Sequence, residues 1–216
     1  MNFPSELEFC SFLQYSPRGT SAISKTSKEV CHAVKTDRSL PGPFWVIKEA
    51  GERIRQTLQN YPFLKQIFGP DVVLVPIPRS SPLKDKNALW PALRICEELK
   101  KQGVALDIMK ILERVTPVNK AATAARGERP TPRDHYESTR IVRQLLTPER
   151  ITLVDDVITQ GSTFIGLFPR LRESFPHAEI NCFALVRTMS GVEVETVLAP
   201  VAGKIVFAHG LPHREP

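Results

Sequence analysis

The chain has 216 residues, of which 42% are hydrophobic and 24% are charged. These proportions are ordinary for a soluble globular protein, and no apolar run is long enough to cross a bilayer, so we expect a single domain over residues 1–216 without a membrane partner. The formal net charge of +6 suits an acidic partner, either nucleic acid or a phosphate-rich small molecule.

Residues 1–70 contain no strand–helix–strand unit. We predict a strand over residues 8–15, a short helix over 27–35 and a longer helix over 44–61, where apolar residues recur near helical spacing. The stretch DRSLPGP separates the two helices. We therefore expect this third of the chain to add an edge strand and covering helices to a core formed by the rest.

Residues 71–208 alternate between predicted strands and helices and form the expected core. DVVLVPIP, residues 71–78, is a short apolar run ended by prolines, which is typical of a strand buried on both faces. The later elements are a helix over 88–103, a strand over 106–114 for which a helix is the alternative, and a strand over 150–156. A helix over 162–175, which we expect Pro169 to kink or end early, and strands over 179–188 and 203–210 follow. Such alternation implies parallel pairing through crossovers. We predict an α/β fold with a central, mostly parallel sheet and helices on both faces.

The stretch ITLVDDVITQGSTF, residues 151–164, ends a strand on two carboxylates. In an open parallel sheet, ligands bind beyond the carboxyl ends of the strands. Asp155 and Asp156 fall at such an end, and their oxygens are acceptors that suit sugar hydroxyls or a hydrated magnesium ion.

The same stretch continues into a turn of hydroxyls and glycine before a predicted helix. Free N–H groups at a helix start favour an anion. Gly161 permits a close approach and a left-handed backbone, while Thr159, Ser162 and Thr163 add hydroxyl donors. The turn therefore suits a monophosphate, and together with the two acids it suits a ribose 5-phosphate.

Each part of this pattern also has a purely structural explanation. Two aspartates after a strand are often an ordinary turn, and a serine or threonine at a helix start is often an ordinary cap. The coincidence of the whole pattern favours the phosphate site. A Walker A loop is excluded because no lysine follows Gly161, and the dinucleotide pattern GxGxxG is absent.

The remaining residues that could carry chemistry give weaker signals. The four cysteines are scattered singly without a CxxC pair, which argues against a zinc site or a disulfide framework and fits a reducing cytoplasm. The histidines show no metal-ligand spacing, so we expect surface or loop positions for His135, His177, His209 and His213. Trp45 and Trp90 are expected in the core.

The stretch ITLVDDVITQGST resembles the phosphoribosyl pyrophosphate (PRPP) motif of type I phosphoribosyltransferases, with Gln160 where a threonine or similar small residue is more usual. The stretches VLVPIPRSSPLKDKNALWPALRI, LERVTPVNKAATAARGER and FALVRT accompany it in the order found in ComF-like members, which are amidophosphoribosyltransferase-like proteins linked to competence. The resemblance covers about residues 71–189. It implies the type I phosphoribosyltransferase fold with a flexible hood loop.

The resemblance also implies roles for individual residues. The 5-phosphate of PRPP would be held by Thr159, Gln160, Gly161, Ser162 and Thr163. Asp155 and Asp156 would be catalytic residues that hold the ribose hydroxyls. They would contact Mg²⁺ indirectly, through water or those hydroxyls. Arg79, Ser80 and Ser81 occupy the place of the pyrophosphate loop, and an arginine can pair with a diphosphate in a forked geometry.

The stretch over residues 114–140 is basic, rich in proline and poor in large apolar residues, and it occupies the place of the hood. A long loop without its own secondary structure is usually a lid or is disordered. Most of its charges are expected in solvent, and the leading candidates to reach the pyrophosphate are Lys120, Arg126 and Arg129. Arg187 would either flank the base pocket or form a salt bridge at a strand end.

The function implied by the resemblance is transfer of a phosphoribosyl group from PRPP, with Mg²⁺, to a small-molecule acceptor, with release of pyrophosphate. The sequence nominates no general base. The acceptor is open between a purine, a pyrimidine, ammonia and other nucleophiles, and so is a homo-oligomeric state.

Two alternatives belong to other classes of function. The same site could sense PRPP or a nucleotide without turnover. The basic surface could instead serve an accessory protein of DNA uptake or processing. Nucleic acid is less favoured because there is no helix-turn-helix and no basic stripe interleaved with aromatic residues.

Overall fold

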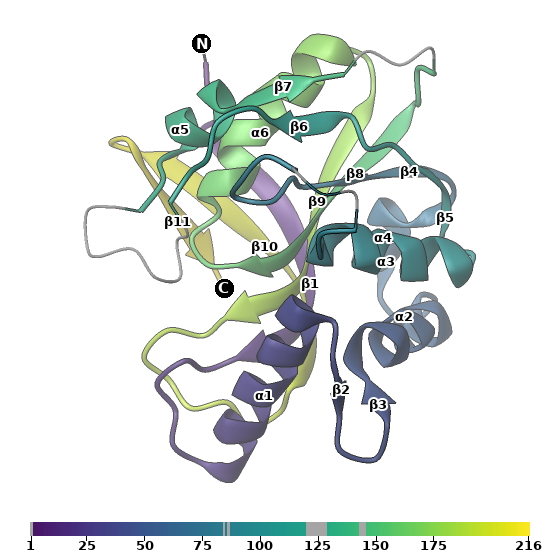
Figure 1. The fold of residues 1–216 in the computed structure, drawn as a ribbon, viewed down its shortest axis with the longest axis vertical. Coiled ribbons are helices and arrows are strands. Elements are labelled where there is room, and N and C mark those ends of the chain that lie inside the picture. The colour runs from purple at the N-terminus through teal and green to yellow at the C-terminus, as the bar shows by residue number, and fades with distance from the viewer. Residues whose placement is uncertain (1, 84, 86, 120–128, 143–145) are drawn as a thin grey trace.

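A computed structural model describes residues 2–83, 85, 87–119, 129–142 and 146–216 of the chain. A seven-stranded sheet crosses the molecule in the order β11–β10–β1–β9–β8–β4–β5 (Figure 1). Neighbouring strands are parallel in the five-stranded part formed by β1 (Glu6–Tyr15), β9 (Glu179–Thr188), β8 (Arg150–Ile158), β4 (Gly69–Pro76) and β5 (Ala105–Ile108). β10 (Leu198–Ala208) and β11 (Leu211–Glu215) extend the sheet in antiparallel pairing beyond β1.

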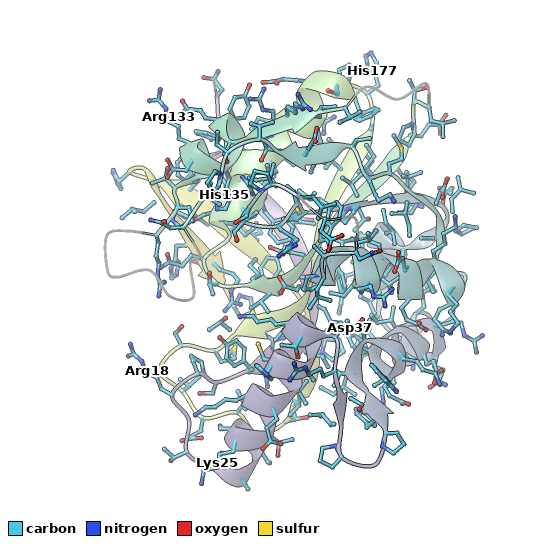
Figure 2. All side chains as sticks on the ribbon, viewed as in Figure 1. Arg18, Lys25, Asp37, Arg133, His135 and His177 are labelled. Carbon is cyan, nitrogen blue, oxygen red and sulfur yellow. The ribbon has the colours of Figure 1, made fainter. Side chains whose placement is uncertain are left out.

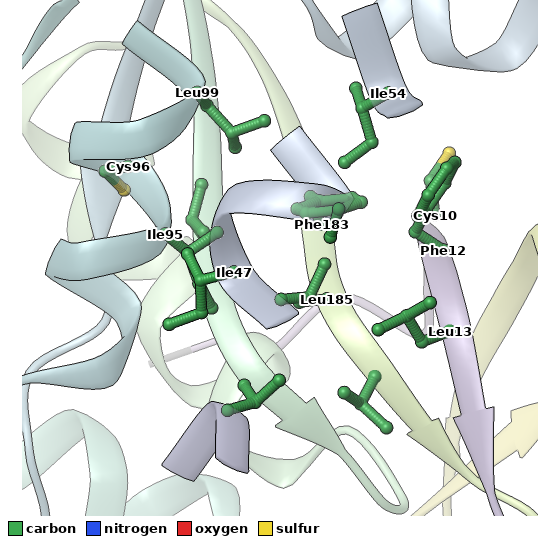
Figure 3. Packing of buried hydrophobic residues seen from close by; sticks show 14 of the residues in the cluster. Cys10, Phe12, Leu13, Ile47, Ile54, Ile95, Cys96, Leu99, Phe183 and Leu185 are labelled. Atoms are coloured by element: carbon green, nitrogen blue, oxygen red, sulfur yellow. The ribbon is translucent and has the colours of Figure 1, made fainter. Parts of the chain in front are cut away.

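Four helices pack on one face of the sheet. They are α1 (Ala22–Thr36), α2 (Val46–Thr57), α3 (Pro62–Ile67) and α4 (Pro91–Lys101). Figure 3 shows Ile95 and Leu99 of α4 with Phe183 and Leu185 of β9 in this core. A small hairpin of β2 (Ser39–Leu40) and β3 (Phe44–Trp45) precedes α2.

The opposite face carries α6 (Ser162–Ser174) and a small cap that we call the hood. The hood consists of α5 (Pro132–Glu137) and the antiparallel strands β6 (Leu112–Arg114) and β7 (Thr139–Ile141). Successive side chains of each central strand point to opposite faces of the sheet. Val154 therefore packs in the core under α1–α4, and Leu153 packs in the core under α6. The expected α/β class, with a mostly parallel sheet and helices on both faces, is confirmed.

The expectation of an edge strand from the N-terminal third is wrong. β1 lies inside the sheet, with Cys10 opposite Phe183 of β9 on one side and opposite Ala202 of β10 on the other. The predicted strand over 203–210 begins earlier, at Leu198, and covers the free side of β1. Strand order depends on contacts between distant segments, which a local hydrophobic pattern does not encode.

Two further expectations are corrected. The single strand predicted over 106–114 is two strands in different sheets, because the chain leaves β5 after Ile108 and enters the hood at Leu112. The helix α6 continues through Pro169 to Ser174, so of the two outcomes expected at Pro169 the early end is wrong, and the kink stays a prediction.

The segment expected to lack secondary structure contains α5 and β7 within its described part. α5 begins with a capping box, in which the Thr131 side chain accepts from the Asp134 amide while the Asp134 side chain accepts from the Thr131 amide. Pro132 at the first helical position completes this start signal.

In the described part of the chain, no helix is both long enough and apolar enough to cross a membrane. All four cysteines are free and buried.

Candidate functional site

A cavity of about 450 Å³ lies at the carboxyl ends of β4 and β8. Residues 77–80, which follow β4, form one wall, and residues 155–164, which lead from β8 into α6, form another. β4 and β8 are adjacent and parallel, so their carboxyl ends bring the two segments together. Hood residues complete the lining.

Asp155 and Asp156 both line this cavity and are both half-buried. Adjacent strand residues point to opposite faces. The charge of Asp155 acts on Arg114 in the hood, and that of Asp156 acts on Cys31 of α1. Burial and the neighbouring charge of Asp156 raise the pKa of Asp155 well above its usual value.

Gly161 shapes the turn between β8 and α6. Its φ is 92°, in the left-handed region, and an added Cβ would lie 2.6 Å from Cγ2 of Ile205 on β10. Another residue there would be strained and would also clash. Gly161 is the N-cap of α6 and offers no side chain to bond the first amides of the helix, which leaves those N–H groups for an anion.

The other residues of the turn surround the same cavity. Ser162 and Thr163 are half-buried at the start of α6, whereas Thr159 and Gln160 are exposed at the rim. All five residues expected to hold a monophosphate, Thr159, Gln160, Gly161, Ser162 and Thr163, therefore line one cavity.

The loop after β4 is fixed in place by hydrogen bonds to several other parts of the structure. The Ile77 amide donates to the Val154 carbonyl over 2.8 Å, and Nε1 of Trp90 donates to the Ile77 carbonyl over 2.6 Å. The Val118 amide donates to the Ser80 carbonyl over 2.8 Å.

Two of the three residues predicted to bind pyrophosphate line the cavity. Arg79 and Ser80 are half-buried members of its wall, whereas Ser81 is exposed and is not among the lining residues. Of the hood candidates, Arg129 is exposed and lines the cavity. Lys120 and Arg126 lie outside the described residues.

Arg114, which we expected in solvent with most hood charges, is buried with only 4% of its surface exposed. Its Nε donates to the Arg79 carbonyl over 3.0 Å, and its Nη1 donates to Ser138 Oγ over 2.5 Å. Desolvation lowers the pKa of Arg114 to about 10, although the charge of Asp155 opposes this shift. In β6, Leu112 and Arg114 are buried and Glu113 is exposed, and this alternation comes from the strand rather than from an apolar pattern in the sequence.

His135 was expected on the surface, and this is wrong. It is 6% exposed, it lines the cavity, and Figure 2 shows it inside the fold while Arg133 and His177 lie at the periphery. Burial and the charge of Arg114 lower the pKa of His135 to about 4. Together with Pro132, His135 forms the buried side of α5.

Arg187 is buried among β1, β9 and β10, and it is not among the residues that line the cavity. Its Nη2 donates to Gln14 Oε1 over 2.7 Å, its Nη1 contacts Ser11 Oγ at 3.3 Å, and it also donates to the Ala199 carbonyl. These partners are neutral oxygens of β1 and β10, so the expected strand-end salt bridge is not seen among the described residues, and the role of Arg187 at a base pocket stays a prediction.

Two residues not nominated from the sequence also line the cavity. Lys35 comes from the last turn of α1, and its charge opposes the rise in the pKa of Asp155. Both tryptophans were expected in the core, but Trp90 is half-buried and forms part of the cavity wall, and Trp45 is 47% exposed.

No protein-family model matches the chain, and no curated protein sequence does. Solved structures similar to it include a hypoxanthine phosphoribosyltransferase from Staphylococcus aureus in a tetragonal crystal form, which is 15% identical with a TM-score of 0.37. The orthorhombic form is 14% identical with a TM-score of 0.35, and in both cases the match covers 69% of this chain and 72% of that chain. A purine phosphoribosyltransferase from Pyrococcus horikoshii Ot3 is 19% identical with a TM-score of 0.30, over 70% of this chain and 91% of that chain. At these values the overlap is partial, and the function has to be argued from the site.

Proposed function

We propose that this protein is a phosphoribosyltransferase of the type I fold, which binds PRPP with Mg²⁺ and transfers the phosphoribosyl group to a small-molecule acceptor. The ComF-like subfamily is part of this proposal. The observation that carries it is the meeting, across one cavity, of the two carboxylates that end β8 and the uncapped amino end of α6.

The two halves of this cavity differ in chemistry in the way that a ribose 5-phosphate requires. The turn at residues 159–163 offers N–H and hydroxyl donors, which suit phosphate oxygens. Asp155 and Asp156 offer carboxyl oxygens, which suit the ribose hydroxyls. Arg79 and Ser80 lie on the neighbouring wall, where they would hold the pyrophosphate.

The donor set suits magnesium in the form that accompanies a diphosphate. No three His, Cys, Asp or Glu side chains among the described residues gather into a metal site made by the protein alone. Magnesium commonly takes one or two carboxylates, with waters and substrate phosphates completing its shell. Asp155 and Asp156 would supply the protein oxygens, and the ion would neutralise charge on the departing pyrophosphate.

Each wall would then contribute to the transfer. The turn anchors the 5-phosphate, so that its binding energy orients the ribose ring for attack. Positive charge develops on the ring as the leaving group departs, as in other glycosyl transfers, and the carboxylates of β8 lie beside it. The hood covers the cavity and restricts water, which is a competing nucleophile. The four free thiols fit the cytoplasmic setting that we propose.

The direct test measures pyrophosphate release from PRPP and Mg²⁺ with a panel of purines, pyrimidines and ammonia. The control is the double variant Asp155→Asn and Asp156→Asn, which keeps the side-chain shape and removes the charge. We expect release that depends on one acceptor and that falls on the order of 100-fold or more in the control. Binding of PRPP without release in any mixture would favour a sensor, and the absence of binding would contradict the proposal.

A further inference from the structure

Two buried side chains of the hood connect the walls of the cavity. Arg114 reaches the Arg79 carbonyl with Nε, and its Nη2 lies 3.5 Å from Nδ1 of His135. Nε2 on the other side of the His135 ring lies 3.4 Å from Oγ1 of Thr163, at the start of α6. A single chain of contacts therefore runs from the loop after β4, through the hood, to the phosphate-facing turn.

The chemistry of these groups determines which atom donates and which accepts in each contact. A guanidinium has only donors, so the Nδ1 atom that faces Arg114 has to present its lone pair. The neighbouring positive charge and the burial of His135 both disfavour a second proton on the ring. The single proton of the neutral ring then lies on Nε2, and it points toward the hydroxyl oxygen of Thr163.

We propose that Arg114 and His135 are positioning residues for the Thr163 hydroxyl. The Nε2–H group of His135 donates to Thr163 Oγ1, so that the hydroxyl directs its own proton into the cavity, toward a phosphate oxygen. We call this series of contacts the relay. This inference rests on the proposed function, because it assumes that a sugar phosphate binds at the turn. It adds a fixed orientation for one hydroxyl and assigns roles to two residues that the PRPP motif does not contain.

A fixed hydroxyl matters because a free one divides its time between orientations. A threonine near a helix start can donate to a backbone carbonyl, and in that state it offers no proton to a ligand. An Nε2–H donor at its oxygen favours the state that donates into the cavity. Both ring contacts are long for hydrogen bonds, and such bonds commonly tighten when a ligand binds.

The first test needs no ligand. Nitrogen NMR of the ¹⁵N-histidine-labelled protein at neutral pH reports which ring nitrogen of His135 carries the proton, with His135→Gln used to assign the signal. We expect the Nε2–H form. A proton on Nδ1, or a doubly protonated ring, would overturn the relay whether or not the protein binds PRPP.

The second test is a double-mutant cycle on affinity for ribose 5-phosphate, measured by calorimetry. We expect His135→Phe, which keeps a planar ring without either nitrogen, and Thr163→Val each to weaken binding roughly tenfold, and the combination to weaken it no further. His135→Gln, which keeps one acceptor and one donor, should recover most of the affinity. In a Ser162→Ala background, His135→Phe should again show its full effect, because Ser162 is not in the chain of contacts.

The outcomes separate the relay from the proposed function. Equal losses from His135→Phe with and without the Thr163 hydroxyl would overturn the relay while phosphate binding by the unmodified protein stands. If the unmodified protein binds neither ribose 5-phosphate nor PRPP, the proposed function fails, and so does the role of Thr163 as a phosphate donor.

Discussion

The buried guanidinium of Arg114 donates to the backbone carbonyl of Arg79 over 3.0 Å, so that one cation of the hood fixes the loop that would hold pyrophosphate. The charge lies in a desolvated setting and is compensated mainly by carbonyl, hydroxyl and imidazole acceptors. Such an arrangement is costly to disturb, because removing a partner leaves a buried polar group unsatisfied.

The substitution Arg114→Lys should therefore destabilise the fold by about 2 kcal/mol and weaken pyrophosphate binding, since an ammonium cannot make the forked set of contacts. Urea unfolding and a calorimetric titration with pyrophosphate measure the two effects. The matched control is Arg140→Lys on β7, where the exposed pair with Glu113 should be worth less than about 1 kcal/mol. Equal effects from both variants would show that the buried contacts of Arg114 do not matter.

Gly161→Ala should destabilise the fold and abolish phosphate binding. The alanine would be strained at a φ of 92°, and its Cβ would approach Ile205 to 2.6 Å. Gly191→Ala is the control, because Gly191 has a φ of 81° with no atom within 4 Å of an added Cβ. We expect Gly161→Ala to cost about 1–3 kcal/mol more than Gly191→Ala, as in other overpacked sites, by urea unfolding. Similar losses in the two variants would mean that the contact with Ile205 relaxes freely.

Trp90→Phe should shift the loop after β4 without unfolding the protein. The change removes the donor that contacts the Ile77 carbonyl over 2.6 Å, at a cost of about 1 kcal/mol. Because Ile77 directly precedes the segment with Arg79, we expect weaker binding of PRPP by calorimetry and a small loss of stability. Trp45→Phe on the exposed hairpin serves as the control and should leave PRPP affinity unchanged.

The burial of His135 predicts a dependence of stability on pH. The pKa of His135 is about 4 in the folded protein, against 6.5 for an ordinary histidine, so the unfolded chain binds the proton more tightly. Stability from this group is therefore complete above about pH 6.5 and is lost as pH falls toward 4, by up to about 3 kcal/mol. The raised pKa of Asp155 acts in the opposite direction, which makes comparison with a variant necessary.

The measurement is urea unfolding of the unmodified protein and of His135→Gln at pH 7.5 and pH 4.5. The unmodified protein should lose more stability than the variant over this interval. The matched control variant is His177→Gln, at an exposed position. A His135→Gln variant that loses as much stability as the unmodified protein would contradict a buried neutral imidazole.

The site residues that the sequence predicted lie together in one short segment, where the residue types and the local backbone both indicate a phosphate and ribose site. Asp155, Asp156 and Gly161 follow one another across a strand end, a turn and a helix start, so that the local sequence determines their common place at the cavity. Arg79 was assigned through the family resemblance, and it lines the same cavity because it follows β4, whose carboxyl end lies next to that of β8.

The parts that the sequence did not predict depend on contacts between distant segments. Cys10 lies on an interior strand only because β10 returns beside it from the far end of the chain. The burial of His135 follows from α5 packing against α6, and no pattern within the basic hood stretch encodes that contact. Arg187 shows the same limitation, since its side chain reaches from β9 to partners on β1 and β10, which come from opposite ends of the sequence.

The most direct test of PRPP binding is a calorimetric titration of the protein with PRPP in the presence of Mg²⁺, alongside the Asp155→Asn, Asp156→Asn double variant. We predict saturable binding by the unmodified protein at or below about 1 mM, the usual range for enzyme substrates, and its loss in the double variant. No heat of binding at millimolar PRPP, or equal binding by both proteins, would contradict a site in which these carboxylates hold the ribose.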